Sequence, residues 1–201
     1  MQRTRWEQTE EPHLYGPFFA ELVARGADID GEARFVDAVA TRGSKILDAG
    51  SGMGRVGAAL QARGHTVVGV DLDPDEIERS RRIFPEMPVV QARLDALTPQ
   101  DLGEHGADFD LIVCVGNVMV FLAEGTEREV LSRLHALART GARLVVGFAV
   151  RKGPPSGRDY PVGEFVADAE SAGWSLEHRF ATFELDPWTE DAEFLVAVLR
   201  A

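Results

Sequence analysis

Residues 46–54 read Ile46-Leu47-Asp48-Ala49-Gly50-Ser51-Gly52-Met53-Gly54, an apolar run that ends in an acid and is followed by three alternating glycines. A second acid, Asp71, follows the next apolar run at 66–70. Glycines at this spacing let a turn pass close to a ligand where a Cβ atom would collide with it. Open α/β sheets bind ligands at the carboxyl ends of neighbouring strands. The two stretches therefore predict a small-molecule site in an α/β fold.

Length and charge narrow the class of protein. The chain has 201 residues, 45% of them apolar and 27% charged, which suits one globular α/β domain. Its net charge of −12 disfavours nucleic acid and anionic membranes as partners. The N-terminus shows no apolar leader segment, and no run approaches the roughly 18 apolar residues of a membrane span. We therefore expect a cytoplasmic protein.

Cysteine and histidine usage disfavours a metal centre. The single cysteine, Cys114, lies inside the apolar run 111–115, which predicts a buried structural thiol rather than a nucleophile. His65, His105, His135 and His178 show no metal-binding spacing with acid pairs. We expect neither a metal site nor a disulfide.

From Lys45 onward, apolar runs alternate with helical patterns, which is typical of a parallel sheet with crossover helices. Residues 1–42 show helical spacing of apolar side chains and predict an N-terminal helical cap or lid, with residues 43–201 as the core domain. Strands are expected at 45–48, 66–70, 89–94, 109–115, 143–150, 176–185 and 193–199. The last two alternate more strongly and predict an antiparallel pair at the sheet edge.

Two helix starts carry capping signals. In the first, Asp73 can cap, Pro74 suits the first turn, and Glu76 can reach back as in a capping box. Thr126 is expected to cap a second helix, whose inward stripe ends at Leu137.

The glycine turn alone leaves two ligands open. Gly52-x-Gly54-x-x-Gly57, with Asp71 nineteen positions after the first glycine, also fits a dinucleotide fingerprint. A pyrophosphate at the following helix N-terminus would be repelled by the nearby Asp48 carboxylate. An acid there suits a ligand with an ammonium group, such as the amino-acid end of S-adenosylmethionine (SAM). The alternative for Asp48 is a hydrogen bond to the turn's own amides.

Two further acids follow strands. Asp71 suits a bidentate hydrogen bond to ribose hydroxyls, with Leu72 placed to pack on an adenine. Asp95 follows the third strand and could accept from the adenine amine, with Leu94 or Ala96 against the ring. Helix capping for Asp71 and an exposed loop position for Asp95 are the competing interpretations.

These residues resemble the class I SAM-dependent methyltransferases of the small bacterial type. The motif 48–54, Asp71, Asp95 and the run 109–117 carry the resemblance. It implies a doubly wound, Rossmann-like and mostly parallel seven-stranded sheet with an antiparallel last strand, and SAM as the cofactor. It also implies a set of cofactor-binding residues: Asp48, Ala49, Gly50, Gly52, Gly54, Asp71, Leu72, Leu94, Asp95, Val115, Gly116 and Asn117.

The sequence says less about the molecule that would accept the methyl group. A methyltransferase of this kind is expected to act on a small organic molecule by direct in-line displacement, because little chain lies outside the core for a macromolecular partner. His13 and Tyr15 are candidate bases or lid residues, and Trp188 is a candidate pocket wall. A surface loop and edge packing are the competing interpretations. An NAD(P)-linked oxidoreductase, disfavoured by Asp48 and by the lack of a Tyr-x-x-x-Lys pair, and a non-catalytic SAM-binding protein are the alternatives. Monomer and homodimer both stay open.

Overall fold

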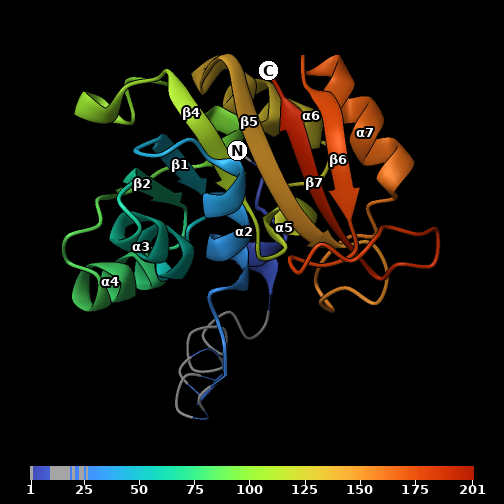
Figure 1. Cartoon of the computed structure of the whole chain (residues 1–201), viewed down its shortest axis with the longest axis horizontal. Helices are drawn as coiled ribbons and strands as arrows, with labels where there is room; N and C mark the ends of the chain where they lie inside the picture. The colour runs from blue at the N-terminus through green and yellow to red at the C-terminus, as the bar shows by residue number, and fades with distance from the viewer. Residues whose placement is uncertain (1, 10–18, 20, 23–24, 26) are drawn as a thin grey trace.

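A computed structural model describes residues 2–9, 19, 21–22, 25 and 27–201. Within this part of the chain, seven strands form one sheet in the order β3-β2-β1-β4-β5-β7-β6 (Figure 1). The strands are β1 Lys45–Ala49, β2 Thr66–Asp71, β3 Val89–Gln91, β4 Phe109–Cys114, β5 Ala138–Ala149, β6 Ser175–Phe180 and β7 Phe194–Arg200. The first five are parallel, and β7 runs antiparallel between β5 and β6. The predicted sheet, including the antiparallel last strand, is confirmed.

Helices cover both faces of the sheet. The α-helices are α2 Gly31–Val39, α3 Arg55–Ala62, α4 Pro74–Ile83, α5 Val118–Phe121, α6 Glu127–Leu137 and α7 Val162–Ser171. Short 3-10 turns are η1 Trp6–Gln8, η3 Leu94–Ala96 and η4 Gly103–His105. None of the helices in the described ranges is both long and apolar enough to cross a membrane.

The central strand β4 shows why two layers of helices are needed. Leu111 and Val113 pack into the cluster formed with α2 and α3, whereas Ile112 and Cys114 pack into the cluster formed with α5, α6 and α7. A strand buried on both faces is apolar nearly throughout, as this one is. On the first face, Phe35 of α2 makes edge-to-face contacts with the aromatic ring of Phe180, at 5.7 Å between centroids. The helical pattern predicted around Phe35 is confirmed by α2. The helix expected around 18–23 lies largely outside the described residues.

The strand order reverses between β1 and β4. From β1 the chain moves outward through β2 to β3, then returns to place β4 on the other side of β1. Adjacent loops at the carboxyl ends of β1 and β4 therefore leave in opposite directions, which opens a crevice at that edge of an α/β sheet. The glycine turn follows β1 directly, so the fold places it at this crevice.

Three strand boundaries differ from the prediction by three residues or more. The third strand stops at Gln91 rather than at residue 94, because Arg93 pairs with Asp95 two residues on and bends the chain into η3. The sixth strand stops at Phe180 rather than at residue 185, because the Thr182 hydroxyl accepts from the amides of Glu184 and Asp186 and closes a turn. The fifth strand begins at residue 138 rather than 143, with a register shift near its start.

One capping prediction is confirmed and two are wrong. The Asp73 side chain accepts from Asp75 N and Glu76 N and caps α4. Glu76 does not complete a capping box, because Asp73 N already donates to Asp71 and the Glu76 carboxylate pairs with Arg79. Thr126 precedes α6 without a side-chain cap, since its hydroxyl donates to Ala123 O at 2.7 Å.

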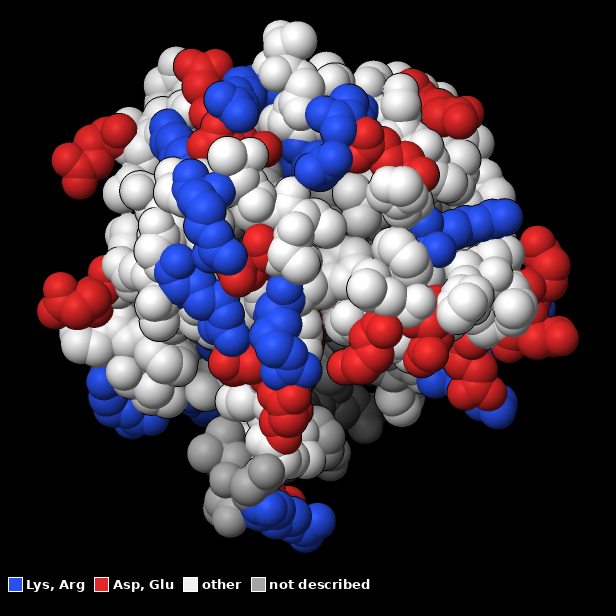
Figure 2. Space-filling model, in the orientation of Figure 1, with Lys and Arg blue, Asp and Glu red and all other residues white. Residues whose placement is uncertain are grey.

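Charged side chains of opposite sign lie beside each other on the face drawn in Figure 2. Around α2, Arg34 pairs with Asp28, and Arg42 pairs with Asp37. On the sheet, Arg143 of β5 and Arg200 of β7 both pair with Glu177 of β6. These arginines are therefore neutralised by neighbouring acids, in keeping with the acidic balance of the chain.

Candidate functional site

The turn that follows β1 is left-handed at its glycines. Gly50, Gly52 and Gly54 have φ values of 82°, 52° and 84°. A Cβ atom at Gly50 would lie 2.4 Å from a Val118 methyl, and one at Gly54 would lie 2.5 Å from Ser80 Oγ. The sequence suggested that these glycines make room for a ligand. At positions 50 and 54 the space is occupied by the protein's own side chains, so there the glycines serve the backbone conformation and close packing.

Asp48 lies at the carboxyl end of β1 and is 2% exposed. Its Oδ2 accepts a hydrogen bond from Gly57 N at 2.9 Å, at the start of α3. Burial is the main cause that raises the pKa of this carboxyl to about 7, and it outweighs the opposing effects of the Gly57 bond and of Arg55. Asp48 therefore bonds the scaffold and also lines a small pocket beside the turn. The hydrogen bond to a backbone amide, which was the alternative given from the sequence, is therefore present. The role of Asp48 toward an ammonium group stays a prediction.

Asp71 ends β2 and braces the glycine turn. Its Oδ2 accepts from Gly52 N at 2.7 Å, and its Oδ1 accepts from Asp73 N at 2.9 Å. Burial raises the pKa of the Asp71 carboxyl above its usual value. Capping of α4 is done by Asp73, so the competing interpretation of Asp71 as a helix cap is not what the structure shows.

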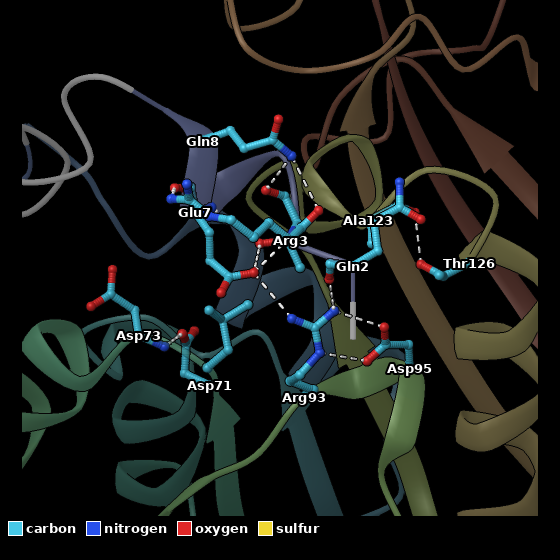
Figure 3. A network of polar contacts seen from close by, with 12 residues as sticks. Gln2, Arg3, Glu7, Gln8, Asp71, Asp73, Arg93, Asp95, Ala123 and Thr126 are labelled. Atoms are coloured by element: carbon cyan, nitrogen blue, oxygen red, sulfur yellow. Dashed lines mark hydrogen bonds and ion pairs between the residues drawn. The ribbon is translucent and has the colours of Figure 1, made fainter.

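Asp95 lies in η3 and is held by an arginine that the sequence did not single out. Arg93 donates from Nε and Nη2 to the two Asp95 oxygens, at 3.0 and 2.8 Å (Figure 3). The same guanidinium reaches Glu7 and the Gln2 carbonyl of the N-terminal segment. Asp95 is therefore a paired, largely buried carboxylate rather than an exposed loop acid.

These residues line two adjoining hollows at the carboxyl edge of the sheet. We call the larger one the main crevice; it is lined by Thr4, Trp6, Gly50, Ser51, Gly52, Asp71, Leu72, Glu76, Ala92, Arg93, Leu94, Asp95, Val115, Gly116, Val118, Phe121, Leu122, Ala123 and Thr126. We call the smaller one the inner pocket; it is lined by Asp48, Gly50, Ser51, Met53, Arg55, Val56, Val115 and Gly116. Gly50, Ser51, Val115 and Gly116 belong to both, so the two hollows meet at the glycine turn and the end of β4.

Most of the sequence-predicted residues are thus brought together, and three are not in these hollows. Ala49 is a fully buried core residue at the end of β1. Gly54 forms the N-cap of α3 and packs on Ser80. Asn117 has a φ of 71°, and its side-chain oxygen accepts from Ala149 N at 2.8 Å, so it ties the end of β4 to the end of β5.

The acceptor candidates lie apart from this pair of hollows or outside the described chain. His13 and Tyr15 lie outside the described residues. Trp188 lines a separate hollow, the distal cavity, which is bounded by residues 150–152, 159, 161–163, 188, 190 and 192. The Arg179 guanidinium stacks over the Trp188 ring at 4.2 Å from the centroid. Trp188 therefore combines a structural contact with a place on a cavity wall.

Cys114 is fully buried at the end of β4, and burial raises the pKa of its thiol to about 12. A thiol with such a pKa stays protonated at neutral pH and is a poor nucleophile. The predicted structural role of Cys114 is confirmed.

Sequence reasoning missed several crevice residues, chief among them Thr4, Trp6, Glu76, Arg93 and Phe121. Trp6 stands in a polar N-terminal stretch, and a large aromatic in such surroundings is a signal that could have marked it. Arg93 precedes Asp95 by two residues, which could have suggested the ion pair. Glu76 was assigned to a capping box instead.

Comparison with known proteins identifies relatives of this chain. A family model described as a methyltransferase domain matches residues 46–141. The crystal structure of a TehB-like SAM-dependent methyltransferase from Corynebacterium glutamicum ATCC 13032 Kitasato is 42% identical, with a TM-score of 0.83 over 93% of this chain and 96% of that chain. The CcbJ methyltransferase from Streptomyces caelestis, at 20% identity, shares the fold with a TM-score of 0.75 over 87% of this chain and 90% of that one.

Curated relatives are longer. An uncharacterized methyltransferase from Mycobacterium sp. (strain JLS) is 25% identical over 178 residues, which are 84% of this chain and 62% of the relative. A second, from Mycobacteroides abscessus, is 23% identical over 85% of this chain and 63% of its own length. The chain thus spans about three fifths of the length of these two relatives.

Proposed function

Because the chain belongs to the class I SAM-dependent methyltransferases, we propose that it transfers the methyl group of SAM to a small organic acceptor by direct in-line displacement. The observation that carries this proposal is the meeting of the main crevice and the inner pocket at Gly50, Ser51, Val115 and Gly116. An extended ligand with a nucleoside at one end and an amino acid at the other suits two hollows that meet at these four residues. The reactive centre of such a ligand would lie where the hollows meet, beside the end of β4.

The residues of the two hollows fit this cofactor. Ser51 Oγ and Glu76 Oε2 are buried without a hydrogen-bond partner within the described part of the chain, and both residues line the main crevice. Buried polar atoms are nearly always paired, so atoms left without partners support a bound ligand. The acids Asp48, Asp71 and Glu76 also disfavour a diphosphate and favour a cationic ligand with hydroxyl donors.

At the inner pocket, Asp48 would accept a hydrogen bond from the ammonium group at the methionine end of SAM. Its carboxylate is buried and bonded through one oxygen to Gly57 N, which fixes its orientation. A nearby positive charge favours the ionised form of a carboxyl, so binding of an ammonium group lowers the raised pKa of Asp48. Proton release on cofactor binding near pH 7 follows from this arrangement.

In the main crevice, Asp71 would hold the ribose, and Leu72, Leu94 and Asp95 would surround the adenine. A carboxylate can accept about four hydrogen bonds, so the bonds from Gly52 N and Asp73 N leave capacity for ribose hydroxyls. Because those two backbone bonds already fix the Asp71 carboxylate, little reorganisation is needed when the ligand binds.

When bound, the cofactor supplies both the reactive methyl carbon and the leaving group. The chain's part is to align the acceptor and to exclude water, for which effective concentration alone can contribute roughly 7–11 kcal/mol. Apolar side chains at the crevice, Val118, Phe121 and Leu122, serve the exclusion of water. His13 and Tyr15 stay the candidates for a general base if the acceptor needs one. The proposed partner is a small molecule, with Trp188 as a candidate for its pocket.

Calorimetric titration with SAM and with S-adenosylhomocysteine (SAH) tests cofactor binding. We expect one ligand per chain with micromolar affinity, and no binding of NADH under the same conditions. Absence of SAM and SAH binding at high micromolar concentration contradicts the proposal.

Turnover is tested by mass spectrometric detection of SAH after incubation with SAM and a panel of small hydroxyl, amine, thiol and carboxylate acceptors. Acceptor-dependent SAH formation supports a methyltransferase. Tight SAM binding without SAH formation against a broad panel favours the non-catalytic SAM-binding alternative.

A further inference from the structure

Residues 2–9, which we call the strap, lie across the main crevice although they are remote from it in sequence. Thr4 and Trp6 line the crevice together with Asp71, Leu72 and Asp95. Thr4 is only 4% exposed, which is low for a polar residue. The strap is therefore docked on the core rather than projecting from it.

Trp6 spans the crevice from one wall to the other. Its indole Nε1–H donates to Asp73 Oδ2 at 2.7 Å, on the turn that follows β2. Its ring meets Phe121 of α5 edge to face, with 5.4 Å between centroids. Asp73 and Phe121 belong to segments that follow β2 and β4, so one side chain links the two sides of the ligand-binding edge.

Arg93 fastens the strap to the residue expected beside the adenine. It binds Asp95 through two nitrogens, and its Nη1 donates to Glu7 Oε2 at 3.0 Å (Figure 3). The same Glu7 oxygen accepts from Thr4 N and Thr4 Oγ1, at 2.7 and 2.9 Å. These Thr4 hydrogen bonds, together with Arg93, hold the pKa of the Glu7 carboxyl below its usual value, so the ion pair persists at neutral pH.

A third attachment fixes the strap on the β4 side. Arg5 N donates to Leu122 O at 3.4 Å, and the Arg5 guanidinium donates to the same carbonyl at 2.9 Å. Leu122 itself lines the main crevice. The strap is thus bound to three segments that surround one hollow.

We infer that the strap is part of the cofactor site, with Trp6 as the wall on the adenosine side and the Glu7–Arg93–Asp95 network as the contact that holds it closed. The inference rests on the proposed function, because it places adenosine in the main crevice. A bound purine adds apolar surface against the Trp6 ring, and burial of that surface stabilises the docked strap. By reciprocity, a docked strap tightens cofactor binding.

The test compares SAH with 5′-methylthioadenosine, which keeps the adenosine and lacks the amino acid. We expect Trp6→Ala to weaken both ligands by about tenfold or more, mostly through faster dissociation. Trp6→Phe keeps the ring and loses the bond to Asp73, so it should weaken both less. Glu7→Gln should weaken both about threefold to tenfold. Ile83→Ala and Glu104→Gln, at exposed positions, are the matched controls and should stay within twofold.

Three outcomes overturn the inference. Unchanged affinities in Trp6→Ala and Glu7→Gln leave no role for the strap. A loss confined to SAH places the strap at the amino-acid end instead. Failure of the unaltered chain to bind either ligand overturns the proposed function itself and is thereby distinguished from the first two.

Hydrogen exchange on the unaltered chain gives a readout that needs no variant. We expect SAH to slow exchange most at the Arg5 amide, which donates to Leu122 O of the core. A smaller slowing is expected at the Gln8 and Thr9 amides, which donate to Arg5 O and Trp6 O within the strap. Protection should be lost in Trp6→Ala at equal saturation. SAH binding without any change in strap exchange contradicts the inference.

Discussion

Two regions share the carboxyl edge of the sheet and differ in how they are built. The paired hollows beside β1 and β4 are lined by acids that are buried or held by neighbours, such as Asp48 at 2% exposure. The distal cavity beside β5 and β7 is bordered by exposed ion pairs, for example Lys152 with Glu193, whose side chains are 78% and 57% exposed. A buried acid lowers the stability of the fold unless a partner compensates for its lost hydration. An exposed ion pair changes the stability of the fold little.

The difference indicates where each kind of specificity lies. The acids Asp48 and Asp71 of the first region lie at the ends of β1 and β2, so their positions are fixed by the sheet. The second is made by the long connections 150–161 and 181–193, whose shape depends on tertiary contacts. On the proposed function, the first region holds the invariable cofactor and the second is free to vary with the acceptor.

The largest effect is expected for Asp71→Ala. The change removes the proposed ribose ligand and leaves Gly52 N and Asp73 N without their acceptor, at about 1–3 kcal/mol for each buried group. SAH affinity measured by calorimetry should fall by about 100-fold. Asp191→Asn, at a fully exposed position of the distal region, is the control and should leave the affinity unchanged. Equal losses in both variants would remove the contrast between the regions.

Glycine replacements separate packing from backbone strain. Gly54→Ala meets Ser80 Oγ at 2.5 Å and keeps a φ of 84°, so the free energy of unfolding should fall by about 2 kcal/mol or more. Gly141→Ala has a similar φ of 76° with open space around the new Cβ, so only about 1 kcal/mol should be lost. Urea denaturation measures both. A loss at Gly54 no larger than that at Gly141 contradicts the packing role.

Asp48→Asn should weaken SAH binding and stabilise the folded state at alkaline pH. The raised pKa means that the folded state keeps a proton which the unfolded state releases above about pH 4, so stability falls as pH rises toward about 7. The variant should therefore be more stable than the unaltered chain by about 3–4 kcal/mol at pH 8 and by little near pH 4. Its SAH affinity should be about tenfold weaker at pH 8.

The pH dependence of binding provides the check. In the unaltered chain, SAH should bind about tenfold more weakly at pH 6 than at pH 8, because Asp48 must lose a proton before it can accept an ammonium group. Calorimetry in buffers of different ionisation enthalpy reports the released proton. A flat profile in the unaltered chain, or a sloped one in Asp48→Asn, contradicts the role of Asp48.

The smallest effect is expected in the distal region. Lys152→Gln and Glu193→Gln, alone and combined, should each change the free energy of unfolding by about 0.5 kcal/mol or less, since both partners are exposed to solvent. A double-mutant cycle in denaturant measures the coupling between them. A coupling above about 1 kcal/mol would show that the two regions differ less than their burial suggests.

The fold and the positions of the residues proposed to bind the cofactor were predictable for one physical reason. Asp48 and Asp71 lie at the ends of β1 and β2, and the glycines follow β1 directly, so local spacing determines where they lie. The mostly parallel seven-stranded sheet with its antiparallel last strand was predicted from the pattern of apolar runs and from the resemblance. Cys114 was assigned correctly from its apolar neighbours alone.

The remainder depends on contacts between distant segments. Trp6 and Asp73 are 67 positions apart, and Glu7 and Arg93 are 86 apart, so no local pattern announces either pair. The Glu76 side chain went to Arg79 because Asp73 N was already bonded to Asp71, a competition that the sequence does not reveal. Trp188 could be placed on a cavity only once the connections 150–161 and 181–193 were seen together.

A crystal structure of the chain with SAH tests the central claim most directly. The account predicts the amino group of the ligand within hydrogen-bond distance of the Asp48 carboxylate, the ribose hydroxyls on Asp71, and Trp6 over the adenosine side. Electron density for SAH outside the joined hollows contradicts the account, as does an Asp48 carboxylate that contacts only Gly57 while SAH is bound.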